Sequence, residues 1–334
     1  MKFSLIICTY MRPEPLVKLL NSVNIQSKYP DEILIIDGSL NKETKIALDK
    51  NNFKNLKYFL VSDRDRGLTR QRNFGISKVA SDSEIVCFLD DDIVLETDYF
   101  ENLLNTYNLF PSALGAAGYI INNNAAWSLN LENEPLQYNH FYYDGWKRKY
   151  SQRYVLRKKM GLLDDCPPGF MPESGNAKAL SFFPPTNKIY PTESFSGGVS
   201  SFRKEILDKI KFSEYFEGYG LYEDTDFTFR LSKLGNIYVN TSAKLYHYHD
   251  EAGRPNKFEY GKMVLRNGWY VWRVAFPKPR FKSRIEWNLI AWLLIIIRAS
   301  NIVSTKKKKE AITETLGRIY GWFSIIINPP KEKK

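Results

Sequence analysis

The chain has 334 residues, 43% hydrophobic and 25% charged, which is typical of globular proteins and excludes a disordered chain. Its three cysteines form no CxxC pair, so the sequence favours neither a disulfide framework nor a zinc site. We therefore expect the protein to lie in the reducing cytoplasm. The net charge of +11 is concentrated in residues 254–334, which hold 18 Lys and Arg against 5 Asp and Glu. The first apolar run is too short for a signal peptide and is predicted to be a strand.

Apolar runs alternate with helical patterns in the first part of the chain. The predicted strands are KFSLIIC (2–8), EILIID (32–37), LKYFLVS (56–62) and EIVCFLD (84–90). Helices are predicted between and after them, because apolar residues recur at helical spacing in 16–23 and 99–107. The alternation predicts an α/β fold with a Rossmann-like, mostly parallel sheet flanked by helices. The dinucleotide-binding motif G-x-G-x-x-G and the phosphate-binding loop G-x-x-x-x-G-K-[ST] are both absent after the first strand. Their absence argues against dehydrogenases and P-loop enzymes.

Three consecutive acids end the fourth predicted strand. Because side chains alternate along a strand, Asp90 and Asp92 are expected on one side and Asp91 on the other. A carboxylate pair at the carboxyl end of a strand suits Mg²⁺ or Mn²⁺ held against substrate phosphates. The alternative is an exposed acidic turn that caps the next helix. Three arginines could face a diphosphate, namely Arg12, Arg66 and Arg70, and for Arg66 and Arg70 the alternative is a solvent-exposed position.

Two later segments could carry chemistry, and each has a structural alternative. In GLYEDTDFTFRL (220–231), Glu223 or Asp224 could act as a general base, although acids are also favoured at helix N-termini. In LYHYHDE (245–251), His247 and His249 share one face of an extended segment, as metal ligands or as structural residues. Between about 120 and 194 the periodicity fades, and irregular structure and loops are expected.

Six segments together resemble the family 2 glycosyltransferases, whose fold is of the GT-A type. They occur in the order SLIICTYMRPEPLVKLLNSV, EILIIDGS, GLTRQRNFGI, FLDDD, FSGGVSSFRKEIL and GLYEDTDFTFRL, over roughly residues 1–250. Two departures are Ile36 before Asp37, where the family often has a second acid, and Val199 after the Gly pair, where it often has Asn. The resemblance implies an inverting transferase that uses a nucleotide sugar.

The resemblance also implies roles for single residues. Asp224 matches the catalytic base, with Glu223 as its alternate. Asp90 and Asp92 match the D-x-D pair, and a metal-binding histidine is implied at His247, with His249 as the alternate. The implied cofactor is Mn²⁺ or Mg²⁺. Residues implied in binding the nucleotide sugar are Thr9, Tyr10, Arg12, Asp37, Arg72, Asn73, Asp90, Asp91, Gly197 and Gly198.

The basic tail also holds five of the seven tryptophans. The apolar run 289–297 is nine residues long, too short to span a bilayer, and 312–327 repeats at amphipathic-helix spacing directly after four lysines. This pairing predicts a helical tail that binds the anionic inner face of the plasma membrane. The alternative is that these helices pack on the catalytic domain or form an oligomer contact. No nucleic-acid-binding motif accompanies the basic residues, so nucleic acid is not an expected partner.

The sequence therefore predicts a GT-A catalytic domain at 1–252 and a helical extension at 253–334. Within the domain, 1–118 is expected to bind the nucleotide and 119–252 the acceptor. The predicted function is metal-dependent, inverting transfer of a sugar to a hydroxyl of a glycan or lipid-linked acceptor in cell-surface polysaccharide synthesis. The alternatives are a metal-dependent nucleotidyltransferase and a catalytically silent, membrane-associated glycan-binding module. The sequence does not indicate an oligomeric state.

Overall fold

The structure is a computed structural model that describes residues 1–122, 126–131, 135–216, 218–248 and 255–331. Contacts between Cα atoms divide the chain into two compact units. One comprises Met1–Asn124 and Pro185–Arg254, and the other comprises Ala125–Pro184 and Pro255–Lys334. Residues 125–184 thus group with the C-terminal helices. The functional division into a catalytic domain of 1–252 and a tail stays a prediction.

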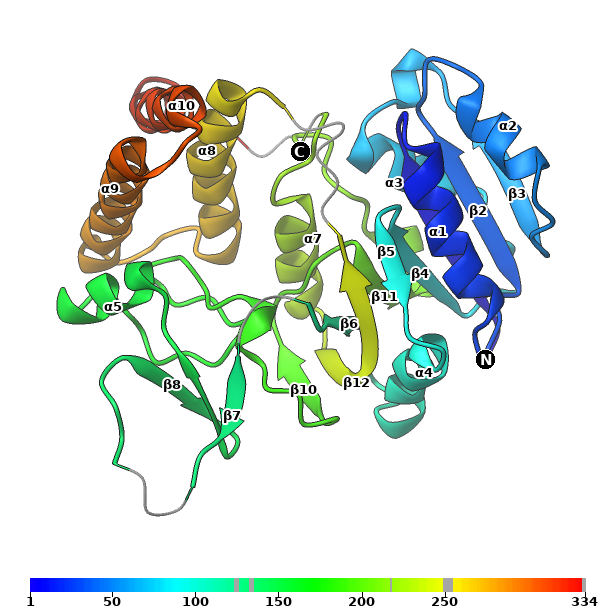
Figure 1. Cartoon of the computed structure of the whole chain (residues 1–334), viewed down its shortest axis with the longest axis horizontal. Helices are drawn as coiled ribbons and strands as arrows, with labels where there is room; N and C mark the ends of the chain where they lie inside the picture. The colour runs from blue at the N-terminus through cyan, green and yellow to red at the C-terminus, as the bar shows by residue number, and fades with distance from the viewer. Residues whose placement is uncertain (123–125, 132–134, 217, 249–254, 332–334) are drawn as a thin grey trace. The chain divides into compact units, whose positions relative to one another are not determined.

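The first unit is built on one large sheet (Figure 1). Its strands lie in the order β10-β12-β6-β11-β4-β1-β2-β3, and β5 pairs with β12. The four predicted strands are confirmed as β1 (Phe3–Thr9), β2 (Glu32–Asp37), β3 (Leu56–Leu60) and β4 (Ile85–Asp90), and they pair in parallel. The later strands are β5 (Ile93–Leu95), β6 (Gly115–Ile120), β10 (Ile189–Thr192), β11 (Val199–Arg203) and β12 (Ile237–His247). The predicted α/β fold is confirmed, with a mixed sheet in which six of the nine described strands run in one direction and β5, β10 and β11 run in the other.

Strand β11 is the main departure from parallel order. It runs antiparallel between β4 and β6, opposing Leu89 with Val199 and Ala117 with Ser200. Strand β12 then pairs in parallel with β6 on its far side. Because β11 runs antiparallel to β4, its first residue, Val199, lies beside the carboxyl end of β4.

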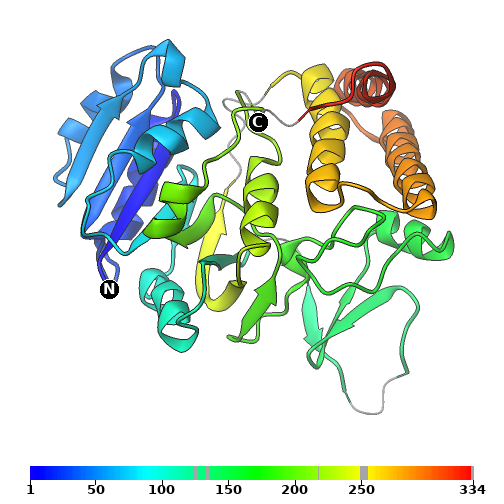
Figure 2. The same cartoon turned by 180° about the vertical axis from the view of Figure 1, so that it is seen from behind.

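Helices cover both faces of this sheet (Figures 1 and 2). They are α1 (Pro13–Asn24), α2 (Glu43–Asp49), α3 (Leu68–Ile76), α4 (Tyr99–Leu109), α6 (Lys204–Lys209) and α7 (Glu223–Ser232), with a 3-10 turn at Asp63–Asp65. The apolar runs of β1 and β2 are fully buried, as strands covered on both faces require. Helix α3 approaches them closely, since a Cβ at Gly75 would lie 2.9 Å from the Ile6 side chain.

The second unit holds more regular structure than the fading periodicity indicated. Residues 126–184 contain β7 (Trp127–Leu129), β8 (His140–Tyr143) and β9 (Trp146–Lys149) as a small antiparallel sheet, then α5 (Gln152–Lys159) and a 3-10 turn at Leu180–Phe182. Aromatic side chains form its core, with Tyr150, Tyr154 and Phe182 buried against Phe141. Rings that pack edge to face need no aliphatic repeat, so a search for period two or 3.6 misses them.

Three long helices, α8 (Lys257–Ala275), α9 (Phe281–Ser304) and α10 (Lys308–Ile327), form the tail. Helices α8 and α10 touch through glycines, because a Cβ at Gly261 would lie 2.2 Å from the Glu314 carbonyl oxygen. Helix α9 joins them through stacked Trp272 and Trp287 rings, whose centroids are 5.3 Å apart. The predicted nine-residue apolar run lies inside α9, which has 24 residues and is long and apolar enough to cross a membrane by length and composition.

Candidate active site

The acidic triplet and His247 come from strands that the sheet brings together. Asp90 is the last residue of β4, and β5 begins three residues later. Strand β5 pairs antiparallel with the end of β12, so that His247 opposes Ile93. The register therefore places the His247 side chain beside Asp92 although 155 positions separate them in sequence. Asn122 fixes the backbone of His247 by donating to its carbonyl and accepting from its N–H, each at 3.0 Å.

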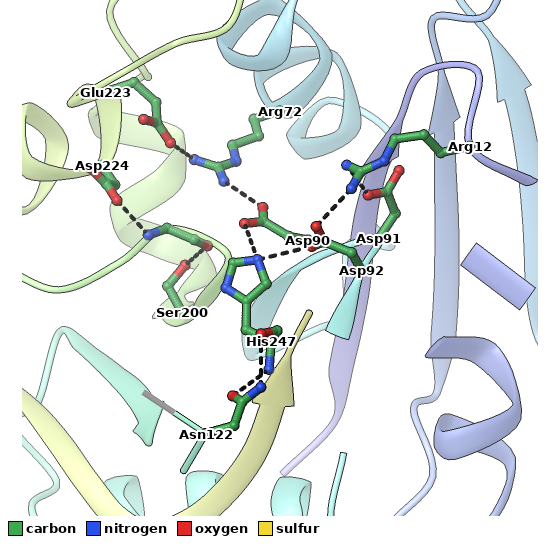
Figure 3. A network of polar contacts seen from close by, with 11 residues as sticks. Arg12, Arg72, Asp90, Asp91, Asp92, Asn122, Ser200, Glu223, Asp224 and His247 are labelled. Carbon is green, nitrogen blue, oxygen red and sulfur yellow. Dashed lines mark hydrogen bonds and ion pairs between the residues drawn. The ribbon is translucent and has the colours of Figure 1, made fainter. Parts of the chain in front are cut away.

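Asp90, Asp92 and His247 form one cluster of ligand atoms, all within 4.8 Å of one another (Figure 3). His247 Nε2 lies 2.9 Å from Asp92 Oδ1 and 4.0 Å from Asp90 Oδ2. Each of the three residues offers one ligand atom to this cluster, and carboxylate oxygens suit Mn²⁺ or Mg²⁺. The donor set therefore fits the implied cation.

Asp91 turns away from this cluster into the interior. It is 3% exposed, accepts a hydrogen bond from Thr9 Oγ1 at 2.7 Å and pairs with Arg12 Nη1 at 2.7 Å. Burial raises the pKa of Asp91 to about 7, although the Arg12 charge and the Thr9 hydrogen bond oppose that rise. Asp90 and Asp92 are thus in the cluster and Asp91 is apart from it, as expected, although Asp91 and Asp92 lie in the turn that follows β4.

Arg12 bridges the two carboxylates that follow the strand. Its second amino group lies 2.7 Å from Asp92 Oδ2, on the oxygen that His247 does not contact. Burial opposes ionisation of Asp92, but the His247 hydrogen bond and the charges of His247 and Arg12 outweigh it, so the pKa of Asp92 lies below its ordinary value. Burial likewise lowers the pKa of His247, yet the Asp92 hydrogen bond and the Asp90 charge raise it overall.

The glycine pair makes room for charged side chains. A Cβ at Gly198 would lie 2.0 Å from Asp90 Oδ2, and one at Gly197 would lie 2.5 Å from Arg72 Nη1. Any side chain at Gly198 would therefore occupy the space of the Asp90 carboxylate. Arg72, only 2% exposed, ion-pairs with Glu223 and lies 3.5 Å from Asp90 Oδ1. The glycines thus let the turn before β11 lie against Asp90 and Arg72.

The two acids at the start of α7 have different surroundings. Glu223 is 5% exposed and pairs with Arg72, a buried ion pair. Asp224 is partly exposed, and its carboxylate accepts from the Gly197 N–H at 3.1 Å and from the Thr225 N–H at 2.6 Å. These donors fix the orientation of the Asp224 carboxylate. A partly exposed, oriented carboxylate is the better placed of the two to meet an acceptor hydroxyl.

Other residues expected to bind the nucleotide make contacts within the protein. Asp37 is fully buried and accepts from the Ser39 N–H and the Tyr58 hydroxyl, both at 2.8 Å. The Asn73 side chain both donates to and accepts from the Phe212 backbone. Tyr10 is 37% exposed. Their nucleotide contacts stay predictions.

Arg66, Arg70 and His249 are the other residues that the sequence suggested for the site. Arg66 donates to the Gly38 carbonyl at 2.7 Å and pairs with Asp63, and Arg70 lies 3.9 Å from Glu214. His249 falls outside the described residues. Among residues that sequence reasoning missed, Gln71 donates to the carbonyls of Thr9 and Ile36, and Asn122 holds His247. Asn122 follows a strand within an asparagine run, which by itself indicates only a turn.

Comparison with known proteins gives a family. A model described as Glycosyl transferase family 2 matches residues 4–172, half of the chain. A glucosyl-dolichyl phosphate glucuronosyltransferase of Haloferax volcanii is 28% identical over 124 residues, which cover 36% of this chain and 39% of that protein. The O-antigen chain rhamnosyltransferase RfbN of Salmonella typhimurium is 31% identical over 106 residues, 31% of this chain and 32% of that protein. The matched stretch thus spans well under half of either relative.

A solved structure shows the same fold. The crystal structure of GalNAc-T7 with UDP, GalNAc and Mn²⁺ aligns with 79% of this chain and 47% of that one, at a TM-score of 0.50 and 14% identity. At this identity the likeness concerns the fold alone, which is of the GT-A type. Together with the family match, it identifies the chain as a member of glycosyl transferase family 2.

Proposed function

We propose that this chain transfers a sugar, with inversion, from a nucleotide sugar to a hydroxyl of a glycan or lipid-linked acceptor. The observation that carries the proposal is the Asp90, Asp92 and His247 cluster beside an oriented Asp224, all within one compact unit. The names of the two relatives support a lipid-linked or polysaccharide acceptor and a place in cell-surface glycan synthesis. Three free cysteines are consistent with a cytoplasmic site for the reaction.

At the donor end, Asp90, Asp92 and His247 would hold Mn²⁺ or Mg²⁺ against the diphosphate of the nucleotide sugar. The cation would supply Lewis-acid stabilisation of the leaving diphosphate. Arg12 and Asn122 orient two of these ligands, Arg12 through Asp92 and Asn122 through the His247 backbone. Ligands held in this way need little rearrangement when the cation binds.

At the acceptor end, Asp224 would act as the base. Its carboxylate takes the proton of the acceptor hydroxyl while that oxygen forms a bond to the anomeric carbon, and the bond from that carbon to the diphosphate oxygen breaks. Attack opposite the leaving group inverts the anomeric configuration. The Gly197 N–H and the Thr225 backbone and hydroxyl hold the carboxylate in place. Glu223 forms an ion pair with Arg72 and would instead position that arginine beside Asp90.

A thermal-shift panel of UDP-, GDP- and dTDP-sugars with and without Mn²⁺ tests the donor site. We expect one nucleotide class to raise the melting temperature only with metal, and Asp92→Ala to abolish that rise. Metal-independent stabilisation by all three classes would contradict the proposal, and so would an unchanged Asp92→Ala.

The base is tested separately by transfer assays. Asp224→Asn is expected to bind the donor almost normally and to lose transfer, because Asn keeps the shape but cannot accept the proton. The matched control is Glu43→Gln, an exposed acid in the first turn of α2, which should transfer normally. Retained transfer by Asp224→Asn would remove Asp224 from this role. Donor hydrolysis by the wild type would exclude a catalytically silent binding module.

A further inference from the structure

Helix α9 is apolar on two opposite sides. One side, formed by Ser283, Trp287, Ile290, Ala291 and Ile295, is buried. On the opposite side lie five exposed apolar residues at intervals of four, four, seven and seven positions, namely Phe281, Ile285, Leu289, Ile296 and Val303. Their exposed fractions run from 46% to 86%. A row of large apolar side chains left exposed along a helix marks a surface that another protein or lipid covers.

Helix α10 repeats this arrangement. Its buried side includes Ala311, Gly317, Gly321 and Ile325. Its opposite side carries exposed Ile312, Leu316, Phe323 and Ile327, at intervals of four, seven and four positions. Helix α8, by contrast, has no residue among 257–275 that is exposed to this degree. The exposed apolar side chains of these three helices therefore belong to α9 and α10, and we call them together the α9–α10 face.

Basic residues accompany this face. From Lys278 to Lys309 the chain has nine Lys and Arg and a single acid, Glu286. Lys306, Lys307, Lys308 and Lys309, in and beside the link between the two helices, are all exposed. A second copy of the chain would bring the same positive charges against each other. An anionic lipid surface would instead pair them with opposite charge while it covers the apolar side chains.

The packing favours binding along the membrane surface over crossing it. The inner side of α9 is held by the stacked Trp272 and Trp287 rings and by the Trp322 indole N–H, which donates to Asn288 at 2.9 Å. Arg298 in the second half of α9 pairs with Glu314 of α10 at 2.7 Å. A spanning α9 would have to break these contacts and bring Arg298 into hydrocarbon, which is costly.

We infer that the α9–α10 face is an interfacial membrane-binding surface that selects anionic phospholipids through Lys306–Lys309. Its apolar side chains enter the headgroup region while the lysines contact lipid headgroups. The inference is independent of the proposed sugar transfer, because lipid binding is measured without donor or metal. It would hold the enzyme where lipid-linked acceptors lie.

The test is co-sedimentation of the full chain with vesicles of phosphatidylcholine alone or with one-third phosphatidylglycerol. We expect binding to the anionic vesicles that weakens as salt is raised. At about 1 kcal/mol for each lysine, Lys306→Gln with Lys309→Gln should weaken partitioning about 30-fold. Leu289→Gln with Ile296→Gln should weaken it on the order of 25-fold. The matched control is Leu109→Gln with Leu234→Gln, two leucines of the other unit that are at least as exposed as Leu289 and Ile296, and this variant should bind like the wild type.

Several results would overturn the inference. They are absence of binding to anionic vesicles, equal binding to phosphatidylcholine alone, and wild-type binding by either α9–α10 variant. A lipid-free dimer, detected by light scattering and split by Leu289→Gln with Ile296→Gln, would assign the face to a second copy. Resistance of the cellular protein to alkaline carbonate extraction would show that α9 spans the membrane.

Discussion

Gly198→Ala is expected to break the metal cluster without unfolding the protein. The added Cβ would lie 2.0 Å from Asp90 Oδ2, whereas ordinary contact begins near 3.4 Å, so the carboxylate must move by more than 1 Å. The Asp90 side chain is 34% exposed and can rotate toward solvent. The cost in folding free energy should therefore stay at or below about 1 kcal/mol, under the usual range for overpacking a closed core. The cluster, however, would fall from three ligands to two.

We expect Mn²⁺ affinity to fall by at least about tenfold. Removing a residue that merely hydrogen-bonds to a metal ligand already costs about ten- to 100-fold, and here a ligand itself is displaced. Calorimetric titration of the purified protein with Mn²⁺, without donor, measures it directly. Gly235→Ala is the control, because the atoms nearest to its added Cβ belong to the Leu114 side chain, which is no part of the cluster. Wild-type Mn²⁺ affinity in Gly198→Ala, with unchanged melting temperature, would refute the assignment of Asp90 as a ligand.

Three further predictions concern other parts of the molecule. Asn122→Ala should weaken Mn²⁺ binding about tenfold by releasing the His247 backbone, and calorimetry showing unchanged affinity would contradict this. Glu32→Gln should lower unfolding free energy at pH 7 by about 1–3 kcal/mol, because Lys57 and the Ala80 N–H outweigh burial and hold the pKa of Glu32 below its ordinary value. A carboxyl group whose pKa is lowered by folding stabilises the protein above about pH 4.5, and this contribution is lost as the pH falls through the native pKa. Denaturant titration at pH 3 should therefore show a smaller stability difference between Glu32→Gln and the wild type than at pH 7. An equal difference at both pH values would refute this prediction. Gly317→Ala should cost about 1–3 kcal/mol by forcing α10 away from the Phe258 carbonyl, whereas Leu316→Ala on the exposed side should change thermal unfolding little.

The grouping of Asp90 with Asp92 agrees with the prediction, although the rule behind that prediction does not strictly apply. An uninterrupted apolar run marks β4, but the strand ends at Asp90, and Asp91 and Asp92 lie in the turn before β5. His247 could be suggested from its place on an extended segment, but its pairing with Asp92 depends on the β5–β12 register, a long-range contact that no local pattern encodes. The role of Arg12 was equally hidden, since an arginine near a strand end can face phosphate, solvent or, as here, two carboxylates.

The helical tail is confirmed, but the regular structure of residues 126–184 and the full length of helix α9 were not predicted, for different reasons. In the first, ring-to-ring packing such as Tyr154 on Phe182 replaces the aliphatic periods that sequence reasoning counts. In the tail, the nine-residue apolar run drew attention away from the polar residues at both its ends, which continue the same helix as far as Phe281 and Ser304. The glycines that bring α8 and α10 together are 56 positions apart, and a glycine within a helix reads locally only as a weak point.

The position of β11 limits how the gene can be shortened. Among the described residues, strand β6 pairs with β11 and β12 alone, and both of these strands follow residue 172 in the chain. A fragment that ends where the family match ends would leave β4 and β6 as two open edges, and such edges promote aggregation. It would also keep Asp90 and Asp92 while losing Gly198, Asp224 and His247. Expression trials should therefore truncate the chain only after His247. Residues 4–172, which match the family model, are not expected to fold and function alone.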